Sequence, residues 1–169
     1  MKKTLLTILI FTFCLTNYAQ ETNTETVTTY YLVRHAEKDI SDKTNRNPRL
    51  TEKGKIRANN LVAVFENVKF DAVYSTNYFR TLNTAKPTAL NQKLETIIYN
   101  VKGFNFDKFK AETKGKNILI VGHSNTTPHF SNKLLGKEKY ENLDESIYSN
   151  LYIITLTGDS ANSILLKID

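Results

Sequence analysis

Two stretches of the chain share one pattern, a run of apolar residues that leads to a histidine. Residues 27–33 are apolar or β-favouring and are followed by Arg34 and His35. Residues 117–121 are almost entirely apolar and lead to His123. Near-continuous apolar runs of this length are typical of strands that are covered on both faces of a sheet. The pattern therefore predicts two central strands, each followed by a histidine.

Strands and helices alternate along the rest of the chain. Further strands are predicted over 71–75 and 95–99, with a closing hairpin that pairs 151–156 with 163–167 around the turn 157–160. Helices are predicted after the N-cap Thr51, over 78–90 with an interruption or kink at Pro87, over a short stretch with Phe104, Phe106 and Phe109 that ends near Gly115, and over 127–135. This alternation predicts the α/β class, as a three-layer α/β/α sandwich around a mostly parallel sheet.

The N-terminal segment has the pattern of a secretory signal peptide. Lys2 and Lys3 precede an apolar stretch, and Ala19 provides a small residue for cleavage. We expect residues 1–19 to be a signal peptide, 20–26 a flexible leader and 27–169 the folded domain. The apolar run is short for a membrane span of roughly 20 residues, and a retained membrane anchor is the alternative. Cleavage predicts an exported protein, periplasmic or secreted, without stable membrane association.

Composition narrows the chemistry and the partners. Cys14 is the only cysteine and lies in the signal segment, so cleavage leaves neither thiol chemistry nor a Cys-bound metal. Loss of Lys2 and Lys3 lowers the formal charge from +6 to +4, and the remaining basic residues are scattered. Nucleic-acid binding is therefore not expected. A mild positive field suits an anionic small substrate.

Four candidate site residues are predicted to converge at one edge of the sheet. Arg34 and His35 end the first strand, His123 ends the fourth, and Arg80 lies early in the helix after the second. In parallel α/β sheets, ligands bind beyond the carboxyl ends of the strands. The planar fork of arginine matches phosphate oxygens, and histidine can act as a covalent nucleophile. We therefore expect two guanidinium groups and two imidazoles in one phosphoryl-binding pocket.

Each of these residues also has a structural explanation when it is taken alone. A histidine at a strand end is often only hydrogen-bonded, and an arginine at a helix start is often a solvated charge. Their joint arrival at one edge favours a site. His129 stands apart within a helix, so a packing or surface role is expected. No metal or cofactor is expected, because the histidines form no compact ligand pair and Arg34 would oppose a cation.

Four motifs in a fixed order resemble the histidine phosphatase superfamily, also called the phosphoglycerate mutase-like family. They are Leu-Val-Arg-His-Ala-Glu-Lys at 32–38, Leu-Thr-Glu-Lys-Gly at 50–54, the segment 75–85, and Val-Gly-His-Ser-Asn-Thr at 121–126. The likeness extends from Tyr31 to about Leu135, and it implies a phosphoglycerate mutase-like fold. Ala36 stands where the family usually has glycine, and little disturbance is expected from so small a residue.

The resemblance implies a role for each matching residue. His35 would be the nucleophile that becomes phosphorylated. Arg34, Arg80 and His123 would bind the phosphoryl oxygens and stabilise the charge that develops during transfer, and Ser124 would join them in substrate binding. Water would then hydrolyse the phosphohistidine without a metal, because the arginines supply the positive charge.

The residue that protonates the leaving group is left open. One branch of the family carries this acid directly after the second histidine, where this chain has Ser124, which cannot serve. Glu37, close to His35 in sequence, and Asp107 are equal candidates, with Glu95 behind them. A surface charge is the structural alternative for Asp107, and pairing with an arginine is the alternative for Glu37.

The predicted function is that of a metal-independent phosphatase that hydrolyses a phosphomonoester outside the cytoplasm. No long insertion separates the second and fourth strands, so the chain is similar to compact phosphatases and an open pocket is expected. The partner would be a phosphorylated small molecule or a phosphoprotein. Two alternatives remain: a phosphohistidine or phosphoprotein phosphatase, and a non-catalytic phosphate-binding protein. The sequence determines neither the substrate nor the oligomeric state.

Overall fold

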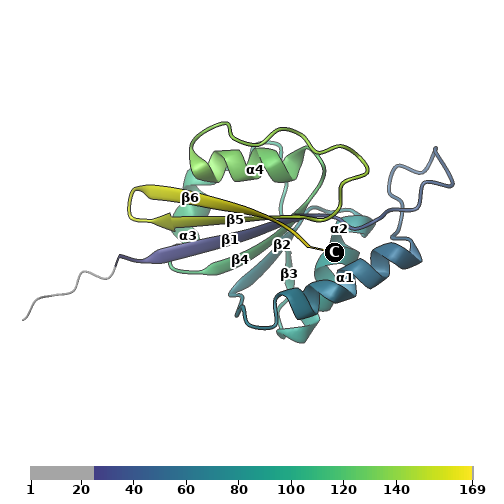
Figure 1. Ribbon diagram of the computed structural model, residues 1–169, viewed down its shortest axis with the longest axis horizontal. Helices are drawn as coiled ribbons and strands as arrows, with labels where there is room; N and C mark the ends of the chain where they lie inside the picture. Colours follow the sequence, from purple (N-terminus) through teal and green to yellow (C-terminus); the bar gives the residue numbers. More distant parts are fainter. Residues whose placement is uncertain (1–24, 169) are drawn as a thin grey trace, which may run out of the picture.

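A central six-stranded sheet organises the chain (Figure 1). The computed structural model describes residues 25–168, so the predicted signal peptide and residues 20–24 of the predicted leader lie outside the described residues. The strands are β1 (Val27–Arg34), β2 (Ala72–Ser75), β3 (Thr96–Ile98), β4 (Asn117–Gly122), β5 (Asn150–Thr157) and β6 (Ser160–Lys167). The helices are α1 (Glu52–Val64), α2 (Phe79–Asn91), α3 (Phe106–Glu112) and α4 (Thr126–Leu135).

The strand order β3-β2-β4-β1-β5-β6 confirms the predicted α/β class with a mostly parallel sheet. β3, β2, β4 and β1 run parallel to one another, and the closing hairpin adds β5 antiparallel to β1. β1 and β4 are therefore central neighbours, as their apolar runs predict. Their register pairs Arg34 with Gly122, which brings the residues that follow the two strands together.

Helices cover both faces of the sheet, which confirms the three-layer arrangement (Figure 1). Along β1, Tyr30 and Leu32 point to the face that packs against α3 and α4, where Phe109 and Phe130 lie. Val33 points to the opposite face, which packs against α1 and α2. Alternate side chains of a strand point to opposite faces, so this central strand needs apolar residues at nearly every position.

Local contacts fix α1 beneath the segment that follows β1. Thr51 caps the helix, since its hydroxyl oxygen accepts a hydrogen bond from the Gly54 N–H at 3.0 Å, as predicted. Gly54 packs so closely on this segment that a Cβ there would collide with the carbonyl oxygen of Glu37. The close approach holds the chain just beyond His35 in place.

Of the interruption or kink predicted at Pro87, the interruption is wrong, because α2 is continuous from Phe79 to Asn91, and a kink stays a prediction. A proline inside a helix costs about 3 kcal/mol, in part through one lost backbone hydrogen bond. Burial on both sides of it, at Ala85, Thr88 and Ala89, offsets that cost. Phe104 also differs from prediction: α3 begins only at Phe106, after a cap in which Asn105 accepts a hydrogen bond from the Lys108 N–H.

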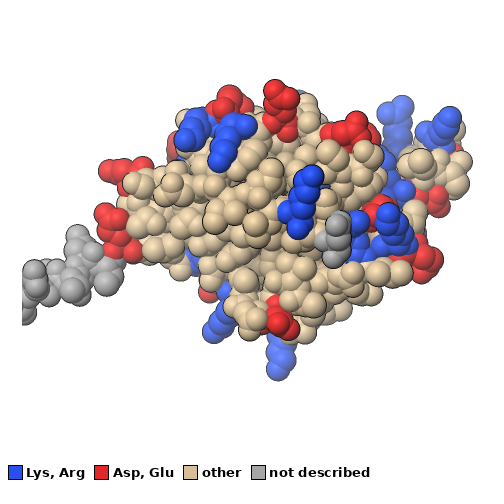
Figure 2. Space-filling view, in the orientation of Figure 1, with Lys and Arg blue, Asp and Glu red and all other residues tan. Residues whose placement is uncertain are grey.

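The outer surface adds two observations. On the face shown in Figure 2, basic side chains are scattered and gather only toward the end that carries α1 and residues 39–49, where acidic side chains lie among them. This fits the expectation that the chain does not bind nucleic acid, which stays a prediction. Among residues 25–168, no helix is both long and apolar enough to cross a membrane.

Candidate active site

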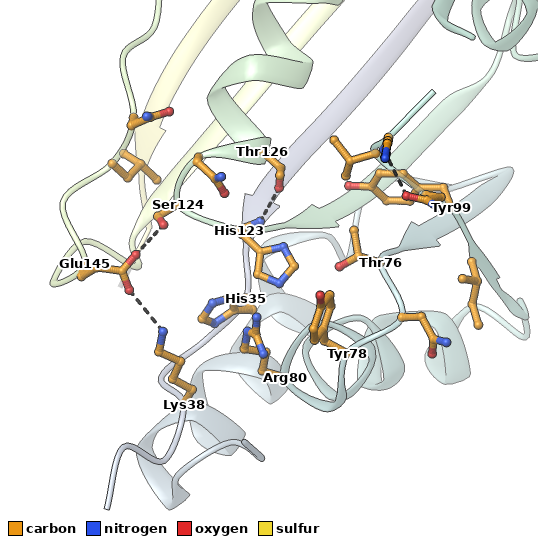
Figure 3. A pocket seen from close by; sticks show the side chains of 18 residues that line it. His35, Lys38, Thr76, Tyr78, Arg80, Tyr99, His123, Ser124, Thr126 and Glu145 are labelled. Carbon is orange, nitrogen blue, oxygen red and sulfur yellow. Dashed lines mark hydrogen bonds and ion pairs between the residues drawn. The ribbon is translucent and has the colours of Figure 1, made fainter. Parts of the chain in front are cut away.

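The two histidines meet at the carboxyl edge of the sheet, as predicted (Figure 3). The His35 N–H donates to the Gly122 carbonyl at 2.9 Å, which extends the β1–β4 ladder by one residue. The rings of His35 and His123 are perpendicular, with centroids 5.4 Å apart. Arg80 reaches the same place from the first turn of α2.

A cavity of about 1170 Å³ opens at this edge. Four of the predicted site residues line it: His35, Arg80, His123 and Ser124. Lys38, Tyr78 and Glu145 line it too, although the sequence did not single them out. Arg34, Glu37, Glu95 and Asp107 do not line it.

His35 is held as a neutral imidazole with a defined tautomer. Its Nδ1 lies 2.7 Å from the Ala36 carbonyl oxygen, which can only accept, so Nδ1 carries the proton and Nε2 keeps its lone pair. Burial lowers the pKa of His35 to about 3, and the positive charges of Arg34 and Arg80 act in the same direction. A buried, neutral histidine with a free Nε2 lone pair can act as a nucleophile at neutral pH.

His123 is positioned by its backbone and by an aromatic neighbour. Its N–H donates to the Thr126 hydroxyl at 2.8 Å, and its ring meets that of Tyr78 edge-on at 5.1 Å. Burial lowers its pKa to about 4, with the nearby charge of Arg80 as the next cause. Among the described residues, the buried Nε2 of His123 has no hydrogen-bond partner.

Arg80 carries unpartnered donors in the same cavity. Its guanidinium lies over the ring of Tyr78, 4.4 Å from the centroid. The buried Nε and one terminal nitrogen find no hydrogen-bond partner in residues 25–168. Buried polar groups are nearly always satisfied, so donors clustered beside a neutral histidine are suited to an anionic ligand. The arrangement can hold the oxygens of a phosphoryl group against His35.

Arg34 has a different environment from the one the sequence predicts. One terminal nitrogen donates to the carbonyl oxygens of Asp144, Glu145 and Ile147, each at 3.0 Å, and the other donates to the Glu145 carboxylate at 2.7 Å. Its side chain is 1% exposed and lies over the ring of Tyr148. Arg34 therefore anchors the segment between α4 and β5, and its contact with a phosphoryl group stays a prediction.

The candidate acids lie away from the cavity. Burial would raise the pKa of Glu37, but hydrogen bonds from Arg57 and the charges of Arg57 and Lys53 lower it on balance. Asp107 is exposed in the first turn of α3, and Glu95 is exposed just before β3. None of the three lines the cavity, so a role in protonating a leaving group stays a prediction.

Glu145 is the only carboxylate among the cavity-lining residues of the described chain, and the sequence did not reveal it. Ser124 donates to one carboxylate oxygen at 2.5 Å, and Arg34 and Lys38 contact the other at 2.7 and 3.3 Å (Figure 3). The Ser124 hydrogen bond, with the charges of Arg34 and Lys38, lowers the pKa of Glu145 to about 2. Its polar surroundings in the sequence carry no signal, because Glu138 and Glu141 occur in the same stretch.

The structure defines an α/β protein with a pocket that is lined by two histidines and an arginine. Residues 30–100 match the family model of the histidine phosphatase superfamily (branch 1). The match covers less than half of the chain, so it marks a likeness to that superfamily, and the structural neighbours add a likeness in fold. No curated protein matches its sequence.

The solved neighbours share the fold at low sequence identity. YhfR from Bacillus stearothermophilus is 16% identical with a TM-score of 0.66, covering 84% of this chain and 98% of that one. The protein histidine phosphatase SixA, solved with tungstate, is 10% identical with a TM-score of 0.65, covering 82% and 96%. Phosphoserine phosphatase from Entamoeba histolytica, solved with phosphoserine, is 16% identical with a TM-score of 0.59, covering 80% and 94%. These likenesses establish the phosphoglycerate mutase-like fold.

Proposed function

We propose that the chain is a metal-independent phosphatase that hydrolyses a phosphomonoester through a phosphohistidine on His35. The observation that carries the proposal is the cluster of unpartnered donors around a neutral, buried histidine. Nε and a terminal nitrogen of Arg80 and Nε2 of His123 are buried without partners among the described residues, beside the free lone pair of His35. Phosphoryl transfer depends mainly on positioning and charge stabilisation, which such groups supply.

The reaction would proceed in two displacements. Nε2 of His35 attacks phosphorus while the bond to the leaving oxygen breaks, and that oxygen departs with the electron pair and takes up a proton. Water then attacks phosphorus and releases a proton to solvent, which balances the proton taken up by the leaving oxygen; the N–P bond breaks, and His35 regains its lone pair as phosphate leaves. Arg80 holds the phosphoryl oxygens throughout, and His123 donates from Nε2 when its ring proton lies there.

A phosphohistidine or other phosphoprotein substrate is the second candidate. It is favoured by the state of the carboxylates: those predicted as acids lie outside the cavity, and Glu145 inside it is held ionised by its partners. An imidazole or a phenolate leaves with less need for a proton than an alkoxide does, so among phosphoprotein substrates this site suits phosphohistidine or phosphotyrosine better than phosphoserine or phosphothreonine. The third reading, a phosphate-binding protein without turnover, is an outcome of the experiment below.

The test is phosphate release from p-nitrophenyl phosphate across acidic to neutral pH, with and without a chelator. We expect turnover that survives chelation and is lost in His35→Ala. The matched control is His129→Ala, which removes an exposed histidine on α4 and should leave the rate unchanged. Activity retained by His35→Ala would refute the mechanism, and a folded but inactive wild type would favour the binding protein.

We also propose that the protein is exported. The support is the signal-peptide pattern of residues 1–19, with Lys2 and Lys3 before an apolar stretch. The mass and N-terminal sequence of the protein recovered from expressing cells test it. A chain that begins after Ala19 is expected, and an intact N-terminus in a membrane fraction would favour the retained anchor.

A further inference from the structure

Glu145 is a carboxylate in a pocket whose other features favour an anion. It is the only Asp or Glu of residues 25–168 that lines the main cavity. Its charge is close enough to act on the pKa of both His123 and Arg80, the two residues with unpartnered buried nitrogens. A negative charge at this place opposes the binding of a second anion.

The donors that hold Glu145 are of the kind that bind phosphoryl oxygens. Arg34 and Lys38 are cationic, and Ser124 donates from its hydroxyl. Charge-assisted hydrogen bonds from arginine suit a carboxylate and a phosphate equally well. Lys38 and Ser124 line the cavity, so a phosphoryl group bound at His35 would lie beside the same donors.

The contact with Arg34 leaves part of that guanidinium unused. Glu145 meets only one terminal nitrogen, and the neighbouring Nε of Arg34 is buried without a partner among the described residues. The edge formed by Nε and a terminal nitrogen is the fork that takes two oxygens of one anion. A phosphoryl group with several oxygens could satisfy this edge more completely than Glu145 does.

The side chain of Glu145 can leave while the rest of the contact stays. Glu145 is 64% exposed, whereas the Arg34 side chain is 1% exposed. The other terminal nitrogen of Arg34 still binds the backbone carbonyl oxygens of Asp144, Glu145 and Ile147. Exchange of the carboxylate therefore needs rotation of one exposed side chain and no movement of the buried arginine.

We propose that Glu145 is a binding-site residue that controls anion affinity. Its carboxylate occupies the Arg34 side of the phosphoryl site as an internal anion and is exchanged for the phosphoryl group of the substrate. Its charge weakens the binding of free phosphate, the product, so that the site is cleared after each turnover. The identity of the exchanged anion rests on the proposed function, but the exchange itself is measured by binding alone.

The experiment is calorimetric titration of the full chain with inorganic phosphate at neutral pH. Glu145→Gln keeps the size of the side chain and removes its charge. We expect phosphate to bind at least about tenfold more tightly, since an anion in this partly buried site no longer faces a like charge. Glu141→Gln is the matched control, because it removes an exposed carboxylate of the same segment outside the main cavity, and its affinity should equal that of wild type.

Two further measurements keep the outcomes separate. Glu145→Asp retains the charge and should bind phosphate within about threefold of wild type, and thermal unfolding verifies that each variant is folded. Unchanged or weaker phosphate binding by Glu145→Gln, or equal tightening in Glu141→Gln, overturns the proposal. The proposal is also overturned if the kcat of Glu145→Gln falls for an alkyl phosphate but not for an aryl phosphate, because Glu145 would then be a proton donor. Tighter binding without any turnover would uphold the exchange and refute the phosphatase.

Discussion

Arg34 and Arg80 are residues of the same type in opposite environments. Arg34 is almost completely buried and donates four hydrogen bonds to the segment between α4 and β5. Arg80 lines the cavity, with two buried nitrogens that have no hydrogen-bond partner among the described residues. Each lies over a tyrosine ring, Tyr148 for Arg34 and Tyr78 for Arg80, at similar distances of 4.3 and 4.4 Å.

The difference shows that an arginine near a site can bind a ligand only with donors that the protein has not already used. Arg34 uses its capacity mainly to hold the chain, so its loss should be felt first in stability. Arg80 keeps its capacity for a ligand, so its loss should be felt in activity. Four predictions test this contrast.

The largest effect is expected from Arg80→Ala on catalysis. We expect kcat/KM to fall by about 10²–10³, the usual cost of removing a donor that stabilises developing charge. The free energy of unfolding should change little, because two of the three guanidinium nitrogens have no hydrogen-bond partner among the described residues. The control is Arg49→Ala, which removes an arginine stacked on Phe79 outside the main cavity. Equal losses in both variants would contradict the prediction.

Arg34→Met should have its main effect on stability. The substitution keeps a long apolar chain but removes the hydrogen bonds to the carbonyl oxygens of residues 144, 145 and 147 and to the Glu145 carboxylate. We expect the free energy of unfolding to fall by about 2–3 kcal/mol, measured by urea titration. A change below about 0.5 kcal/mol would mean that Arg34 does not anchor the segment.

Acidic pH should destabilise the fold through the two histidines. The folded pKa values of His35 and His123, about 3 and 4, lie below the ordinary value of 6.5, so the unfolded chain binds more protons between these values. The contribution of these histidines to the free energy of unfolding is therefore fully present above pH 6.5. It falls as the pH decreases, by up to about 1.4 kcal/mol per pH unit for each histidine. Glu145, whose folded pKa of about 2 lies below the ordinary 4.5, stabilises the fold at neutral pH and loses this contribution only as the pH falls below about 4.5.

Arg80, but not burial, can be removed by substitution to test the cause of this pH dependence. Burial is the first cause of the low pKa of His123, and the charge of Arg80 is the second. Arg80→Ala should therefore raise the pKa of His123, observed by NMR titration of the ring protons, and should reduce the acid slope of stability. Stability that is independent of pH between 6.5 and 5 would contradict the proposed environment of both histidines.

The smallest effects are expected from the two tyrosines. A cation–π contact contributes about 0.5–2 kcal/mol. Tyr78→Leu should lower kcat/KM severalfold, since the ring orients Arg80 and His123. Tyr148→Leu should instead lower the free energy of unfolding by about 1 kcal/mol, because its ring covers Arg34. The reverse assignment of effects would mean that the two arginines do not differ as described.

Most of the fold could be predicted because its signals are local. The apolar runs of β1 and β4 required cover on both faces, and the alternation of strands with helices required parallel neighbours. The interruption expected at Pro87 failed because the burial of Ala85 and Ala89 belongs to packing between elements, which a local rule cannot include. The late start of α3 likewise reflects a cap at Asn105 that competes with the Phe-rich pattern.

The sequence by itself determined the α/β class of the fold and the convergence of His35, Arg80 and His123. These follow from residues at the ends of elements, and parallel strands carry such ends to one edge. Only the tertiary structure decided which groups remain free to act. The partners of Arg34 lie more than a hundred positions away, on an irregular segment that no periodicity describes. Hydrogen bonds and desolvation act between neighbours in space, so the pairing of Arg34 with Glu145, and the freedom of Arg80, arise only when the chain is folded.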